Sequence, residues 1–125
     1  MRSLIICVPV GVTVGEICSR LLEFGMQVEP QGDRIVVSRE GSTAWIEVDS
    51  DGELRREYDL DEIAHISELI GDWEGFVIDY RSLSVANSVA AAVCSRWKCV
   101  VDDDNGFIGL GSDYLESQSG EDRIN

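Results

Sequence analysis

The sequence contains few residues that perform chemistry. Its 125 residues include one histidine and four cysteines, and no C-x-x-C pair occurs. A structural zinc site needs a closed set of nitrogen and sulfur ligands at recognisable spacing, so these residues do not predict one. The cysteines are also too few for a disulfide framework in a chain of this length. We expect four small, buried and reduced side chains at Cys7, Cys18, Cys94 and Cys99.

Long hydrophobic runs and basic residues are scarce as well. No apolar stretch approaches the roughly 18 residues that would suggest a membrane span. The opening segment MRSLIICVPV is short and interrupted by Pro9, so we interpret it as a buried strand of a cytoplasmic protein rather than as a signal peptide. Ten basic residues against 24 acidic ones give a net charge of −14. Such a charge repels phosphates and anionic lipids, and we therefore expect no direct binding of nucleic acid or membrane.

The acidic residues are concentrated in one part of the chain. Between Glu47 and Asp79 there are twelve acidic residues and only two basic ones, Arg55 and Arg56. A dense negative surface speeds the encounter with a basic protein, although it can also serve only to keep a protein soluble.

The hydrophobic pattern predicts an α+β fold. We expect a single domain at 1–115 with a mixed, mainly antiparallel sheet and about three helices packed chiefly on one face, followed by a flexible tail at 116–125. Thr13 and Asp59 each precede a glutamate by three residues, the spacing of a capping box at a helix start. A third helix is expected at 84–97. Strands are expected at 3–10, 26–29, 34–40, 43–49, 54–58, 76–78, 99–101 and 107–110.

Two turns carry much of the acidity. Asp51-Gly52 predicts a hairpin that leads into the strand at 54–58, and Asn105-Gly106 predicts a type I′ turn between 100–101 and 107–108. Neither segment has calcium-loop spacing, because glycine occupies the wrong position in each. The aspartates before the second turn either shield a sheet edge or face a partner.

Other chemistry has weaker support. His65 lies between Glu62 and Glu68 on a predicted helix, and no nucleophile can be assigned to it from spacing. One alternative function is a small-ligand-binding or enzymatic α+β domain with a pocket lined by Trp97, Tyr80 and His65. Another is a self-assembling structural or regulatory domain.

A family resemblance favours a binding function. The segment FVIDYR at 76–81, the small-residue helix after it and VDDDNGFIGLGSDYL resemble small acidic bacterial immunity proteins of polymorphic and contact-dependent growth-inhibition toxin systems, over about 59–115. The resemblance implies a non-enzymatic cytoplasmic inhibitor without a cofactor, which binds one cognate toxin domain, often a nuclease, and blocks its active site or substrate surface. It assigns no individual residue.

The charge pattern independently favours a basic partner. A nuclease must attract phosphates, so its working face is positive, and a negative protein competes for that face. Buried aromatic side chains must supply part of the affinity, because exposed ion pairs contribute little. We therefore expect Trp45 and Tyr58 to be aromatic anchors. The main acidic patch is expected to comprise Asp49, Asp51, Glu53, Glu57, Asp59, Asp61 and Glu62. A second acidic patch is expected at Asp102, Asp103 and Asp104.

Overall fold

The computed structural model describes the backbone of residues 2–49 and 52–124, with side chains as far as Gln118. Its elements in chain order are β1 (Arg2–Pro9), α1 (Val14–Glu23), β2 (Gln27–Gln31), β3 (Arg34–Arg39), β4 (Ser42–Val48), α2 (Glu53–Glu57), α3 (Leu60–Ile70), β5 (Trp73–Tyr80), α4 (Leu83–Cys94), β6 (Val100–Asp102), β7 (Ile108–Leu110) and α5 (Gly111–Ile124). The α+β prediction is confirmed.

The described strands form one seven-stranded sheet in the order β2-β3-β4-β5-β1-β6-β7. Every neighbouring pair is antiparallel, so the expectation of a mixed sheet is wrong. The apolar strands β1 and β5 pair along their whole length near the centre, where each is hydrogen-bonded on both sides. Of the two edge strands, β2 is mostly polar, whereas β7 carries the apolar residues Ile108 and Leu110.

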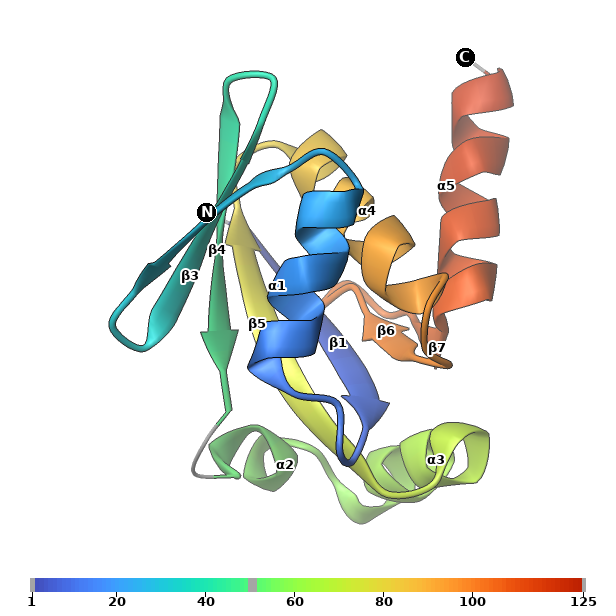
Figure 1. Cartoon of the computed structure of the whole chain (residues 1–125). Coiled ribbons are helices and arrows are strands. Elements are labelled where there is room, and N and C mark those ends of the chain that lie inside the picture. Colours follow the sequence, from blue (N-terminus) through green and yellow to red (C-terminus); the bar gives the residue numbers. More distant parts are fainter. Residues whose placement is uncertain (1, 50–51, 125) are drawn as a thin grey trace.

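Helices cover the two faces of the sheet unequally. Figure 1 shows α1 and α4 in front of the sheet, with α5 beside α4, whereas α2 and α3 lie at its lower end. Alternation along β1 sends Leu4, Ile6 and Val8 into the larger core with α1 and α4. On the opposite side, which we call the outer face, Cys7 packs with Ile66 of α3 in a smaller core. The expectation of helices chiefly on one face therefore holds for three of the five described helices.

Local signals predicted the starts of two helices. Thr13 and Glu16 form a complete capping box at α1, and Asp59 and Glu62 form another at α3. Each box satisfies backbone N–H groups that an isolated helix end leaves without partners.

The segment after β4 departs from expectation. Residues 53–57 form the helix α2 instead of a strand, and β4 pairs with β5. Leu54 is buried and occupies the space above Gly75, where a side chain on Gly75 would collide with it. A single buried side chain is enough to anchor a short helix, whereas a half-buried strand needs an apolar side chain at every second position.

Two chain segments extend further than expected. Pro30 lies inside β2, which is possible because β2 is an edge strand and needs no N–H on its free side. Residues 111–124 form α5, so the segment expected to be a tail is helical up to Ile124. Its flexibility stays a prediction.

Candidate partner-binding surface

Part of the outer face is left without a helical cover. Cross-strand register places Val36 of β3 beside Trp45 of β4, and Trp45 beside Asp79 of β5. All three are only partly buried. The main contacts of α3 are with β1, β5, β6 and β7, and none of comparable extent joins α3 to β3 or β4, which carry Val36 and Trp45. We call the exposed part of the outer face around Val36, Trp45, Val77 and Asp79 the open end.

A hollow of about 340 Å³ separates the open end from α2. Val77 and Leu54 contribute apolar side chains to it. Five carboxylates line it, and no Lys or Arg does: Asp33, Glu47, Asp49, Glu53 and Glu57. One of them has a structural task, since the Asp49 carboxylate accepts a hydrogen bond from the Leu54 N–H at 3.2 Å and so holds the start of α2.

A second hollow, of about 410 Å³, adjoins the first. Glu57 lines both hollows, and Ile5 in the second is the cross-strand neighbour of Val77 in the first. The second hollow adds the acidic residues Glu62, Asp102 and Asp104 together with Tyr58. We call these two neighbouring hollows together the acidic groove; β4, α2, α3 and the loop after β6 contribute residues to it.

The floor of the groove contains a buried carboxylate. Asp102 is 7% exposed, and its Oδ2 accepts a hydrogen bond of 2.6 Å from the Tyr58 hydroxyl. Its Oδ1 accepts another of 2.8 Å from the backbone N–H of Asp104. Burial, and then the hydrogen bond to Asp102 and its charge, raise the pKa of Tyr58 far above its usual value. Tyr58 therefore stays protonated and holds the β6 end against the segment between α2 and α3.

The same segment is fixed by aromatic contacts. The Tyr58 ring meets the Trp73 ring edge to face, with centroids 6.0 Å apart and an interplanar angle of 74°. The Arg55 guanidinium lies 4.6 Å from the centroid of Trp73. Tyr58 and Asp102 thus hold the groove together from within. Only the exposed part of the Tyr58 side chain can contact a partner in the anchor role expected for it.

The loop between β6 and β7 differs from the predicted turn. Positive φ angles occur at Asp104 (57°) and Gly106 (101°), so Asn105-Gly106 is not a type I′ turn, although the hairpin itself is present. The reason is the Asp103 carboxylate, whose Oδ1 accepts hydrogen bonds from the N–H groups of Asn105 at 2.8 Å and Phe107 at 3.0 Å. This carboxylate organises a five-residue loop, and Asp104 is left exposed at its surface.

The structure brings most of the predicted binding residues together. Those that line the groove are Asp49, Glu53, Glu57, Tyr58, Glu62, Asp102 and Asp104. Trp45 lies beside it on the open end, while Asp59, Asp61 and Asp103 do not line it, and Asp51 lies outside the described residues. Glu47 and Asp33 were missed. The alternation of β4, which sets Trp45 and Glu47 on the same side, was the signal for Glu47.

The pocket predicted for a small-ligand or enzymatic domain does not form from its three residues. The His65 ring contacts the Ile108 carbonyl through Nε2 at 3.1 Å, on the outer face. Tyr80 belongs to the core with α4, and Trp97 lines a groove beside α1 with Arg20 and Arg96. Tyr80 and His65 lie on opposite faces of the sheet, and Trp97, in the segment after α4, lies beside α1.

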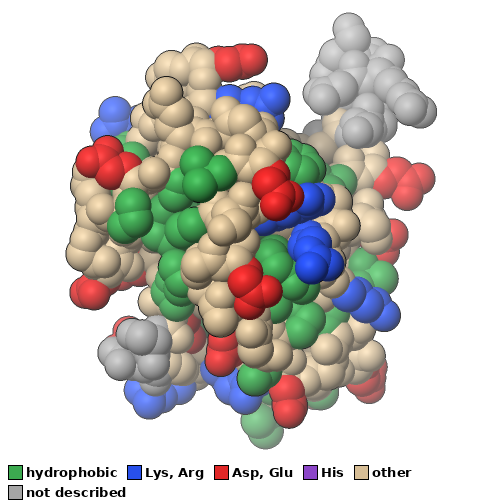
Figure 2. All heavy atoms as spheres, in the orientation of Figure 1, with side chains coloured by type: hydrophobic (Ala, Val, Ile, Leu, Met, Phe, Trp, Pro, Cys, Tyr) green, Lys and Arg blue, Asp and Glu red, His purple; other side chains and the backbone are tan. Residues whose placement is uncertain are grey.

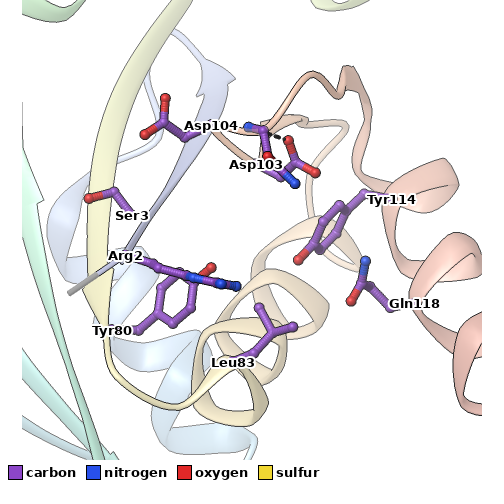
Figure 3. Close-up of a pocket in the computed structure, with 9 residues that line it drawn as sticks. Arg2, Ser3, Tyr80, Leu83, Asp103, Asp104, Tyr114 and Gln118 are labelled. Carbon is purple, nitrogen blue, oxygen red and sulfur yellow. Dashed lines mark hydrogen bonds between the residues drawn. The ribbon is translucent and has the colours of Figure 1, made fainter.

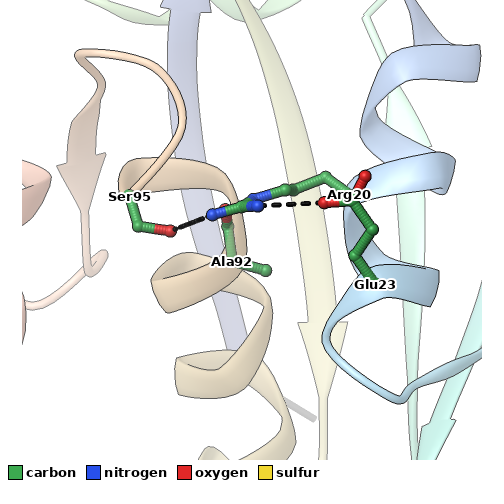
Figure 4. A network of polar contacts seen from close by, with 4 residues as sticks. All are labelled: Arg20, Glu23, Ala92 and Ser95. Carbon is green, nitrogen blue, oxygen red and sulfur yellow. Dashed lines mark hydrogen bonds and ion pairs between the residues drawn. The ribbon is translucent and has the colours of Figure 1, made fainter.

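The helical side of the molecule has a different character. Figure 2 shows this side, where several Lys and Arg side chains lie among apolar ones, with Asp and Glu side chains beside them and around the rim. Arg20 of α1 donates to the Ala92 carbonyl and the Ser95 hydroxyl, both at 2.9 Å, and pairs with Glu23 at 3.0 Å (Figure 4). This guanidinium ties α1 to the end of α4.

None of the described helices is both long enough and apolar enough to cross a membrane. Within the same described residues, no three His, Cys, Asp or Glu side chains are grouped so that they could hold a metal ion. Comparison with known proteins found no family model, curated protein or solved structure that matches this chain, so the resemblance to immunity proteins stays a prediction.

Proposed function

We propose that the chain is a non-enzymatic immunity protein that binds the basic surface of a cognate toxin domain, and that the acidic groove and the open end are its binding surface. The observation that carries the proposal is the convergence of carboxylates from β4, α2, α3 and the β6–β7 loop beside a partly exposed tryptophan. A chain whose acidity served only solubility would have no need to gather it beside an uncovered apolar surface.

The groove and the open end offer complementary contributions. Carboxylates that face solvent raise the rate of encounter with a cationic surface, while exposed ion pairs add little to the affinity once formed. Trp45 with Val36 and Val77 supplies apolar area that a partner can bury, and Trp is enriched among the residues that dominate interface energies. A nuclease domain fits both requirements, since its substrate-binding face must be positive.

The partner to test is the toxin domain encoded by the neighbouring reading frame, with the association rate measured at several salt concentrations. Glu47→Gln, Glu53→Gln and Glu57→Gln together remove three charges from the groove. The matched control removes three exposed charges elsewhere: Glu68→Gln, Asp113→Asn and Glu116→Gln. We expect the groove variant to associate about tenfold more slowly than the control at low salt, with a flatter salt dependence.

The control separates the position of the charges from their number. If both variants slow association equally, net charge alone matters and the groove is not the binding surface. If wild-type chain neither binds the toxin domain nor suppresses its activity, the proposed function is wrong.

A further inference from the structure

A further cavity, which shares Asp104 with the lining of the acidic groove, opens at the other end of the central strands. It has a volume of about 480 Å³ and lies where the start of β1 and the end of β5 meet α4, α5 and the β6–β7 loop (Figure 3). Segments from both ends of the chain line it. Its size is within the range of about 300–1,000 Å³ typical of small-molecule sites.

Opposite charges face each other across this cavity. Figure 3 shows the Arg2 guanidinium reaching in from β1, with Asp103 and Asp104 in the loop across from it. Neither ion pair of the described residues joins Arg2 to these aspartates. The backbone N–H groups of the loop use Oδ1 of Asp103, which leaves its Oδ2 to face a guest. A guest with both a negative and a positive group would satisfy both walls at once.

The wall of the cavity also contains a polar group without a partner. Tyr80 is 5% exposed, but its hydroxyl is not a buried atom, since it points into the open cavity (Figure 3). Among the described residues no hydrogen bond engages this hydroxyl. Tyr114 on the opposite wall is different, because its hydroxyl donates to Asn87 Oδ1 at 2.6 Å, and Asn87 in turn donates to Gln118 at 3.4 Å. The Tyr80 hydroxyl can therefore donate a hydrogen bond to an acceptor that enters the cavity.

The hydroxyl of Tyr80 is suited to donate. Burial and the nearby charges of Asp103 and Asp104 raise the pKa of Tyr80, against the opposing effect of Arg2. It therefore remains protonated at neutral pH and can donate to an anionic oxygen brought close to Arg2.

We propose that this cavity binds a free α-amino acid, whose carboxylate contacts Arg2 and the Tyr80 hydroxyl and whose ammonium group contacts Asp103 and Asp104. The proposal does not depend on the toxin-binding function, because Arg2, Tyr80 and Asp103 do not line the acidic groove; Asp104 is shared by the two sites. The cavity has room for a side chain next to Leu83 and Tyr114, which favours an amino acid larger than glycine.

The test is a titration of the full chain, labelled with nitrogen-15, with each of the common L-amino acids. Each is used in three forms: free, as the carboxamide without the carboxylate, and as the N-acetyl derivative without the ammonium group. We expect at least one free amino acid to shift the amide signals of Tyr80 and residues 103–105 saturably, and both blocked forms to bind about tenfold more weakly or worse. The absence of any saturable shift, or equal binding of a blocked form, would overturn the proposal.

Variants assign the two walls. Arg2→Gln should weaken binding of the free amino acid about tenfold while leaving that of the carboxamide nearly unchanged, and Tyr80→Phe should weaken it less. Arg39→Gln, at an exposed arginine of β3 on another part of the surface, is the matched control and should have no effect. If Arg2→Gln binds the free amino acid as wild type does, the carboxylate is not held at Arg2 and the assignment fails.

Discussion

The two ends of the outer face each carry a tryptophan, but only one of the two is covered. At one end α3 and the side chains of Tyr58 and Arg55 close over Trp73, which is 4% exposed. At the open end Trp45 packs beside Val36 on the bare sheet and stays partly exposed. Since apolar area left in water gains nothing for folding, the covered end contributes to stability and the open end is available for binding. The acidic groove runs between them.

The largest effect is expected at the covered end. Trp73→Ala should lower the free energy of unfolding by about 3–5 kcal/mol, because it leaves a cavity beneath α3 and removes the surface against which Tyr58 and Arg55 pack. Urea unfolding monitored by circular dichroism measures the loss.

Trp73→Phe is the matched control for this prediction. The Trp73 Nε1 is buried and has no hydrogen-bond partner among the described residues, so Phe loses no hydrogen bond there. We expect a cost well below that of Trp73→Ala. Equal losses for the two variants would mean that a phenyl ring replaces none of the packing of the larger indole ring.

The next effect lies at the boundary of the two ends. Tyr58→Phe removes the hydroxyl that donates to the buried Asp102 carboxylate and should destabilise the protein by about 1.5–3 kcal/mol at pH 7. The measurement is again urea unfolding, with Tyr114→Phe as a comparison that removes the hydroxyl donated to a neutral amide and should cost less.

The stabilisation by Tyr58 should decrease at alkaline pH. Its pKa is raised in the folded state above the unfolded value of about 10. The stabilisation from Tyr58 is therefore complete below about pH 10 and is lost as the pH rises toward the folded pKa. The stability difference between wild type and Tyr58→Phe should shrink between about pH 9 and pH 11. A difference that stays constant over this interval would show that the Tyr58 hydroxyl is not held by Asp102.

A smaller loss of stability is expected at the open end. Trp45→Ala should change the free energy of unfolding by no more than about 1 kcal/mol, the scale of a cross-strand pair on an exposed sheet surface. Its affinity for the toxin partner should nevertheless fall by a factor of about 30, as for a residue that dominates an interface. Calorimetric titration measures the affinity. A loss of stability as large as that of Trp73→Ala would mean that Trp45 is packed against the rest of the protein as Trp73 is, and is not available to a partner.

Local sequence signals account for part of this arrangement. The capping boxes at Thr13 and Asp59 involve residues three positions apart, so each could be predicted without knowledge of the fold. The helix at residues 53–57 could not be predicted in this way, because it depends on the Leu54 side chain filling the space that Gly75, which has no side chain, leaves open. A tertiary contact of this kind overrides the strand expected at 54–58.

Most of the residues that line the groove could be predicted from the sequence, but their arrangement around it could not. Asp49 and Glu57 meet Asp102 and Asp104 only because β4, β5, β1 and β6 are neighbours in that order, which no local pattern reveals. The burial of Asp102 was equally hidden. A run of three aspartates is typical of a solvated loop, and the Tyr58 hydroxyl that stabilises the first of them lies 44 residues away in the sequence.

The smallest effect on stability is expected for the exposed ion pair between Arg34 and Glu47. Arg34 lies opposite Glu47 on the outer face, with Nη2 and Oε2 4.0 Å apart and both side chains about half exposed, at 53% and 52%. Arg34→Gln should leave the free energy of unfolding unchanged within about 0.5 kcal/mol, because a solvated pair at this distance is strongly screened. It should nevertheless speed association with a basic toxin domain by about twofold at low salt, since it frees the Glu47 carboxylate at the edge of the groove. Stopped-flow measurements on Arg34→Gln and Glu47→Gln should show opposite changes of rate. Slower association of both variants would mean that Arg34 itself contacts an acidic group of the partner, and the open end would then recognise a mixed surface rather than a purely cationic one.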